Sequence, residues 1–204
     1  MAQETGEQAE ISALNRNTLY ANNSLSLAIG LPAAWFSSTA VNLFFGWGSL
    51  EQPALATIAS LATISLATLP LQGMVGYFLA ALNAARRTEI TVIVSLVCIA
   101  LFLLVAFPLK AQFGLLGVVI ALSVTYVASW IVFSVFSITL GGWALADCGF
   151  SRATLMLLGL NGGIAALFIF LSWLMPESAL QHVVFGSLWC AASLFASLRL
   201  HQRL

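Results

Sequence analysis

The sequence predicts an all-α, polytopic membrane protein, a bundle of about six transmembrane helices, and two features of its composition lead to this class. Of the 204 residues, 61% are hydrophobic and only 7% are charged, whereas a soluble domain carries about 25% charged residues. The chain therefore has too few charges to keep a water-facing surface solvated. Seven basic residues balance seven acidic ones, which leaves no excess positive charge for phosphates, so we expect no nucleic-acid partner.

Six uncharged stretches are each long enough to cross a bilayer once. A spanning helix needs about 20 apolar residues, because the hydrocarbon core is about 30 Å thick and a helix rises about 1.5 Å per residue. After their polar and glycine-rich ends are trimmed, the predicted spans are 24–46, 54–81, 90–108, 114–140, 154–175 and 179–199. Their short connections place consecutive helices side by side and antiparallel. We expect one six-helix transmembrane domain over residues 24–204.

Residues 1–23 are predicted to form a separate cytoplasmic or interfacial segment. Ile11, Leu14 and Thr18 would share one face of a helix, which favours a lead-in helix at the membrane surface, with a frayed tail as an equal alternative. No basic residue precedes Arg16, so the segment lacks the charged start of a cleavable signal peptide.

The basic residues predict the orientation of the bundle. Six lie on one side of the predicted membrane and one lies on the other: Arg16, Arg86, Arg87, Arg152, Arg199 and Arg203 against Lys110. Positively charged loops remain in the cytoplasm. Both termini are therefore expected to be cytoplasmic.

The predicted spans lack the groups of an enzyme or an ion-coupled carrier. Arg199 stands at the end of the last span, and none of the six spans has a charged residue in its interior, where pumps and voltage sensors place theirs. The two histidines lie at opposite ends of the last helix, and the three cysteines are scattered, so neither a metal site nor a disulfide framework is indicated. We expect no enzyme, no catalytic residue, no metal and no cofactor.

Three polar residues inside the spans are candidate substrate-binding residues: Asn42, Gln72 and Asn161. They either line a hydrophilic cavity or form hydrogen bonds between helices, typically of about 1 kcal/mol each, and the second interpretation is favoured. Gln72 follows Pro70 and precedes Gly73, so it is also placed to meet backbone carbonyls freed by a kink.

Arg86 and Arg87 are two further candidates, in the predicted cytoplasmic turn. They either anchor that turn at the membrane surface, which is favoured, or also meet a diphosphate at the mouth of a cavity.

Other residues near the span ends have simpler interpretations. Trp47 and Trp173 fit the aromatic belt at a membrane interface. His182 binds a head group or, as favoured, is a solvated or capping histidine. Gly159 and Gly163 form a Gly-x-x-x-Gly pattern, which is typical of close packing against a neighbouring helix.

Three sequence blocks together resemble the MurJ/MviN-type lipid II flippase family. The first runs from Leu31-Pro32-Ala33-Ala34 to Leu43-Phe44-Phe45-Gly46-Trp47-Gly48-Ser49. The second is the helix end and turn Tyr77–Thr88, and the third is the helix start Phe113–Ser123. The turn departs from the family pattern, because Arg86-Arg87-Thr88 has no acidic residue before it and no proline after it. The resemblance covers residues 11–145 well and the last two helices by pattern, and it corresponds to the last six of the family's fourteen helices.

This resemblance implies a function in transport across the bacterial inner membrane. The chain would be the C-terminal-lobe-like part of a flippase for lipid-linked oligosaccharides, with the peptidoglycan precursor lipid II as the expected substrate and a role in cell-wall biogenesis and cell shape. Its partners would be membrane lipid, the lipid-linked precursor and a lobe that supplies the first helices and their arginines. The alternatives are a non-transporting membrane scaffold or truncated remnant, and a polysaccharide-unit exporter of the same superfamily.

Overall fold

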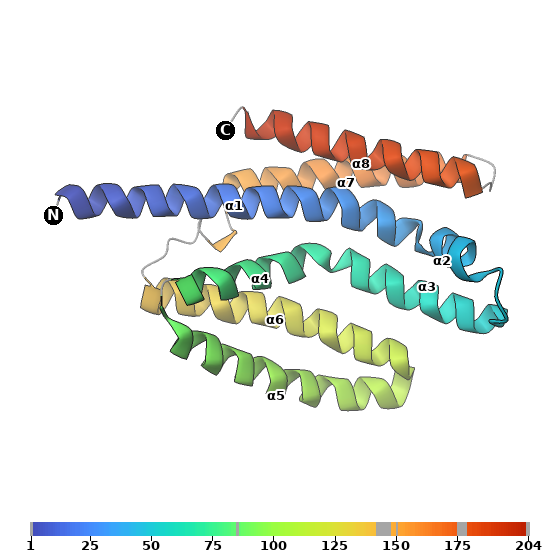
Figure 1. Ribbon diagram of the computed structural model, residues 1–204, viewed down its shortest axis with the longest axis horizontal. Helices are drawn as coiled ribbons and strands as arrows, with labels where there is room; N and C mark the ends of the chain where they lie inside the picture. Colours follow the sequence, from blue (N-terminus) through green and yellow to red (C-terminus); the bar gives the residue numbers. More distant parts are fainter. Residues whose placement is uncertain (1, 85, 142–147, 150, 175–178, 203–204) are drawn as a thin grey trace.

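The computed structural model describes residues 2–84, 86–141, 148–149, 151–174 and 179–202, and these residues form eight helices. The helices are α1 (Ala2–Trp35), α2 (Ser37–Phe45), α3 (Gln52–Ala67), α4 (Leu69–Ala84), α5 (Thr88–Phe113), α6 (Leu115–Gly141), α7 (Arg152–Trp173) and α8 (Ala179–His201). Figure 1 shows them as one elongated bundle, and the described residues include no strand.

Four of these helices are long and apolar enough to cross a membrane by themselves: α5, α6, α7 and α8. The other four form two bent pairs. α1 and α2 meet at 66°, and α3 and α4 meet at 49°. If each pair is one span, the total is six. The predicted class, an all-α polytopic membrane protein, is confirmed, and two of its predicted spans (24–46 and 54–81) are broken helices.

Residues 2–23 are helical and continue into the first span without a break. α1 runs from Ala2 to Trp35, so residue 24 marks no helix end. Leu19, Tyr20 and Asn23 are buried within the bundle. The last part of the predicted N-terminal segment therefore packs against the other helices.

A proline, which cannot donate a helical hydrogen bond, lies just before the first bend and just after the second. Pro32 lies in the last turn of α1, and a proline has no N–H for the carbonyl one turn before it. The chain then turns at Phe36. At the second bend, Pro70 has no N–H to donate, and the Thr68 hydroxyl donates to the carbonyls of Ile64 (3.2 Å) and Ser65 (3.0 Å). The Ile64 carbonyl also keeps its bond from Thr68 N–H, so the hydroxyl substitutes for a backbone donor at Ser65.

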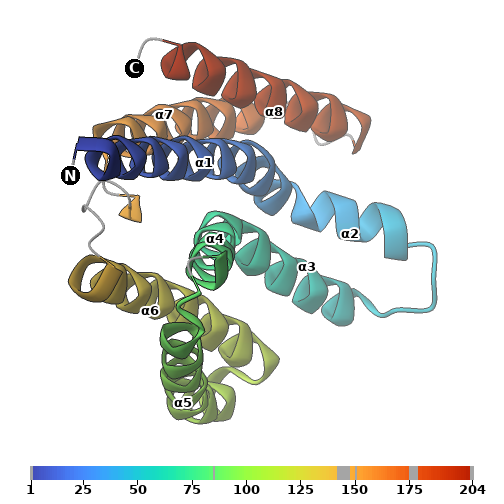
Figure 2. The same ribbon diagram turned by 60° about the vertical axis from the view of Figure 1, so that its left-hand side comes forward.

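α1 is the central helix of the bundle. It contacts α7 and α8 on one side and α3 and α4 on the other, as Figures 1 and 2 show. Gly30 of α1 approaches α3 closely, because a Cβ built there would lie 2.7 Å from the carbonyl oxygen of Leu66. A Cβ built at Gly159 or Gly163 of α7 would have no neighbouring atom within 4 Å. No described helix therefore packs closely against these two glycines, and the prediction of close packing there is wrong.

Buried clusters join neighbouring helices, while large apolar side chains cover the outside. Phe78 of α4 stacks on Phe133 of α6 with ring centroids 6.1 Å apart, and Tyr20, Leu27 and Leu157 join α1 to α7. α5 and α6 form an antiparallel pair whose turn lies at Gly114, where φ is +59°. On α5, Leu104 and Phe107 are among many exposed apolar residues, as expected for a helix that faces lipid.

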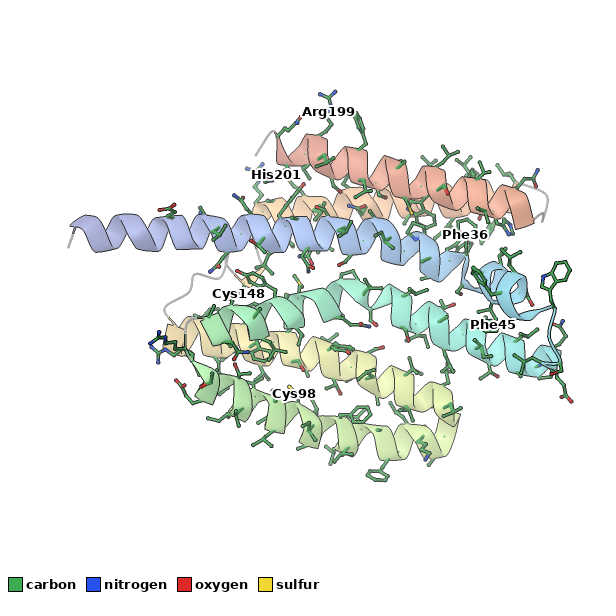
Figure 3. All side chains as sticks on the ribbon, viewed as in Figure 1. Phe36, Phe45, Cys98, Cys148, Arg199 and His201 are labelled. Atoms are coloured by element: carbon green, nitrogen blue, oxygen red, sulfur yellow. The ribbon has the colours of Figure 1, made fainter. Side chains whose placement is uncertain are left out.

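The two ends of the bundle differ in charge. Figure 1 places the start of α1, the α4–α5 turn and the end of α8 at one end, with the α1–α2 bend and the α5–α6 turn at the other. Arg86, Arg87 and Arg199 therefore share an end, and Lys110 lies at the opposite one. Figure 3 shows Arg199 pointing away from the bundle, and Arg203 lies outside the described residues. Which end is cytoplasmic stays a prediction.

Candidate functional site

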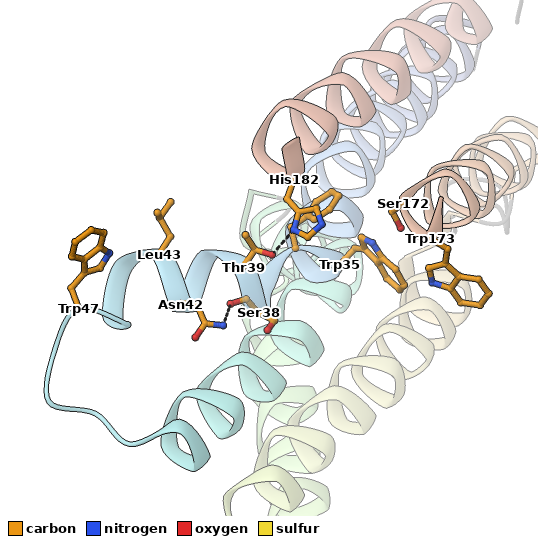
Figure 4. A pocket seen from close by; sticks show the side chains of 10 residues that line it. Trp35, Ser38, Thr39, Asn42, Leu43, Trp47, Ser172, Trp173 and His182 are labelled. Carbon is orange, nitrogen blue, oxygen red and sulfur yellow. Dashed lines mark hydrogen bonds between the residues drawn. The ribbon is translucent and has the colours of Figure 1, made fainter. Parts of the chain in front are cut away.

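A cavity of about 820 Å³ opens where α1 bends into α2. We call it the elbow cavity; Figure 4 shows its lining. The wall comes from the α1–α2 bend, the end of α7 and the start of α8: Trp35, Phe36, Ser38, Thr39, Asn42, Leu43, Trp47, Ser172, Trp173 and His182. Its volume lies in the range of about 300–1,000 Å³ that is typical of ligand sites.

Phe36 fixes the angle at which α2 leaves α1. Its ring lies 5.4 Å from the ring of His182 and 6.4 Å from that of Trp189, centroid to centroid. A Cβ built on Gly186 would lie 2.9 Å from Cδ2 of Phe36. The lack of a side chain at Gly186 therefore lets Phe36 rest on α8, and this contact holds the bend open beneath the cavity.

A hydrogen bond closes the cavity wall between α2 and α8. Thr39 Oγ1 and His182 Nδ1 lie 2.9 Å apart. On α2 itself, Asn42 Nδ2 donates to the carbonyl oxygen of Ser38 over 3.0 Å. The exposed Asn42 thus presents an amide to the cavity from a fixed position.

The lining residues that the structure describes are polar or aromatic and carry no permanent charge. Hydroxyl groups of Ser38, Thr39 and Ser172, the Asn42 amide and the His182 ring supply hydrogen-bond partners, and no Asp, Glu, Lys or Arg is among these described residues. Such a surface can pack against and hydrogen-bond an uncharged polar group. It offers no fixed cation to a phosphate.

A second, smaller cavity of about 370 Å³ adjoins the first. We call it the inner cavity; it shares Trp35 and Ser38 with the elbow cavity. Its other lining residues are mostly apolar: Leu31, Ala34, Ser37, Thr63, Ala165, Ile169 and Trp189. Trp189 is 1% exposed, and its Nε1 has no hydrogen-bond partner among the described residues.

The structure does not bring the candidate residues from the sequence together. Asn42 lines the elbow cavity. Gln72 lies at the second bend, where its Nε2 donates to Ser65 O and Thr68 Oγ1, each over 3.2 Å. Gln72 thus meets a backbone carbonyl beside the kink.

Asn161 is fully buried between α7 and α8. Its Nδ2 donates to Leu157 O over 3.0 Å and to Ser197 Oγ over 3.2 Å, and Tyr20 OH of α1 donates to the Ser197 carbonyl over 2.8 Å. Asn161 therefore takes part in interhelical hydrogen bonding and lines neither cavity.

Arg86 and Arg87 close the turn between α4 and α5. Arg86 adopts a left-handed φ of 56°, while Arg87 N donates to Leu82 O and Arg86 N to Asn83 O. This is the Schellman pattern that ends a helix, usually with glycine at the left-handed position. The Arg87 side chain is exposed and lies 3.9 Å from Glu89. A role for the two arginines in substrate binding stays a prediction.

The sequence did not indicate that Trp35, Thr39 and Ser172 line a cavity. It predicted an interfacial belt for Trp47 and Trp173, which also line this cavity. The proline three positions before Trp35 marks the helix break, but it does not reveal that the ends of α7 and α8 meet the bend there. For metals, the described residues contain no group of three or more His, Cys, Asp or Glu side chains that could hold one.

Comparison with known proteins identifies the fold. No family model matches the sequence, and no curated protein matches it. A solved structure described as "Lipid II flippase MurJ, inward closed conformation" is similar, with a TM-score of 0.76 and 10% sequence identity. The likeness covers 97% of this chain and 40% of that one. The chain thus has the fold of part of a flippase-like transporter and spans less than half the length of that protein.

Proposed function

We propose that the chain is the C-terminal-lobe-like component of a flippase for lipid-linked oligosaccharides, with lipid II as the expected substrate. The observation that carries the proposal is the structural likeness over 97% of the chain. The three sequence blocks between Leu31 and Ser123 also support it, because they resemble the same family in their residues and their order. The chain would act in the bacterial inner membrane with both termini in the cytoplasm, as a transporter and not as an enzyme.

The broken helices suit such a role. Discontinuous helices are common in transporters, where one bundle rocks against another around a central site. The two bent pairs, α1–α2 and α3–α4, lie next to each other and contact each other. Movement of a second lobe against this face would change the access to the space between the lobes.

The chain by itself lacks the charges that a lipid diphosphate requires. The four helices that qualify as spans alone carry their few charged residues near their ends, at Glu89, Lys110, Arg152 and Arg199. An uncompensated charge at the bilayer centre costs at least about 3 kcal/mol. A partner lobe would therefore supply the cations and the other wall of the substrate cavity.

The partner can be sought directly. The tagged chain would be purified from membranes of its own host in mild detergent, and copurified proteins identified by mass spectrometry. We expect a polytopic protein with arginines inside its spans, and we expect lipid II translocation when both are placed in liposomes. A chain that purifies alone from its host, with no such partner encoded there, would favour the scaffold or remnant alternative.

A further inference from the structure

The elbow cavity combines aromatic faces with neutral hydrogen-bonding groups. Trp35 and Trp173 are 40% and 76% exposed while lining it, and Figure 4 draws Trp35 between His182 and Trp173. A sugar ring presents C–H groups on its faces and hydroxyls around its edge. The C–H faces pack on indole rings, and the hydroxyls exchange hydrogen bonds with groups such as Thr39 and Asn42.

The lining of the elbow cavity also argues against a phosphate as the ligand head. A phosphate that leaves water needs a cation or several donors to offset the lost hydration. The described lining residues include no arginine or lysine, and the histidine among them already shares a hydrogen bond with Thr39. This lining therefore does not favour a phosphate as the ligand head.

The inner cavity adds room for an apolar group. Leu31, Ala34 and Ile169 are among its lining residues, and its Trp189 indole N–H is buried without an acceptor among the described residues. That nitrogen has an accessible area below 1 Å², so a ligand atom does not reach it, and the inner cavity offers an apolar chain mainly apolar contacts.

We propose that the elbow and inner cavities together form a binding site for a neutral glycolipid. The uncharged sugar head lies in the elbow cavity between Trp35 and Trp173, and the apolar chain enters the inner cavity. The site does not depend on the proposed flippase function, because it needs no partner lobe and no diphosphate.

Native mass spectrometry of the delipidated chain in a polyoxyethylene-ether detergent tests the site. Three lipids with identical acyl chains are titrated: monoglucosyl diacylglycerol, phosphatidylcholine and phosphatidic acid. We expect the glucosyl lipid to bind at least about fivefold more tightly than the other two lipids. One aromatic stacking contact contributes about 1 kcal/mol, which corresponds to about a fivefold difference in affinity. Equal affinity for all three lipids, or tighter binding of phosphatidic acid, would overturn the proposal.

Matched variants locate the binding. Trp173→Leu and Thr39→Val should each weaken glucosyl-lipid binding at least about threefold, because they remove a stacking face and a hydrogen-bonding hydroxyl. Phe170→Leu, also exposed on α7, and Thr139→Val, exposed on α6, lie outside both cavities and should bind as the parent does. A similar loss in the control variants would show that lipid associates with the general surface and would refute the site.

Discussion

Asn161 has a polar side chain whose partners all lie within the bundle. It is fully buried and donates to both Leu157 and Ser197, while its Oδ1 has no partner among the described residues. The sequence left two interpretations open, a cavity lining or an interhelical hydrogen bond. Sequence could not decide between them, because the choice depends on whether Ser197, 36 residues later, lies opposite.

Replacement of Asn161 by alanine should destabilise the chain. The change removes the bond to Ser197 and leaves a small void, together about 1–2 kcal/mol. Reversible unfolding in mixed detergent–SDS micelles measures it, with Gly162→Ala as the control, since a Cβ at Gly162 meets nothing within 4 Å. If the two variants unfold alike, the α7–α8 hydrogen bond does not contribute to stability.

The partner of Gln72 was easier to anticipate than that of His182, which was expected to be a solvated or capping histidine. The neighbouring Pro70 indicates a freed carbonyl, and Gln72 does bond to Ser65 O beside the bend. His182 pairs with Thr39 across helices that are 143 residues apart in sequence. The type of each side chain was informative, but its partner follows only from the tertiary arrangement.

At the scale of elements, hydropathy locates helices well and their bends poorly. The uncharged stretches 90–108 and 154–175 correspond closely to α5 and α7. The stretches 24–46 and 54–81 contain prolines that allow a bend, yet the angles of 66° and 49° depend on contacts such as Phe36 on Gly186. Those contacts join distant segments, so no local pattern encodes them.

The packing of α1 on α3 should be sensitive to a single methyl group. Gly30→Ala places a Cβ 2.7 Å from the Leu66 carbonyl oxygen, which is backbone and must move, so we expect a loss of about 1–3 kcal/mol. Gly163→Ala, in α7 with nothing within 4 Å, should instead be neutral or raise stability by up to about 1 kcal/mol through helix propensity. The same micelle unfolding assay compares the two. Equal stability would show that α1 and α3 are not in close contact.

At the scale of the whole molecule, the shared end of the basic residues predicts a topology. Figure 1 places the end of α8 and the α4–α5 turn at one end and the α1–α2 region at the other. Since positive charge stays in the cytoplasm, a reporter fused after Leu204 should read as cytoplasmic and one inserted at Ser49 as periplasmic. Paired alkaline phosphatase and green fluorescent protein fusions measure this. A periplasmic C-terminus would mean an odd number of spans or an inverted bundle.

The chain should not translocate lipid II by itself. It matches only 40% of the length of the flippase that it resembles, and the interiors of its spans offer amides and hydroxyls but no cation for a diphosphate. A homodimer would bring together two lobes with the same lack of charge, so self-association would not supply the missing stabilisation of at least about 3 kcal/mol. Purified chain in liposomes with fluorescent lipid II should therefore give translocation equal to that of empty liposomes, with a full-length lipid II flippase as the positive control. Robust flipping by this chain alone would show that it balances the diphosphate charge without a second lobe.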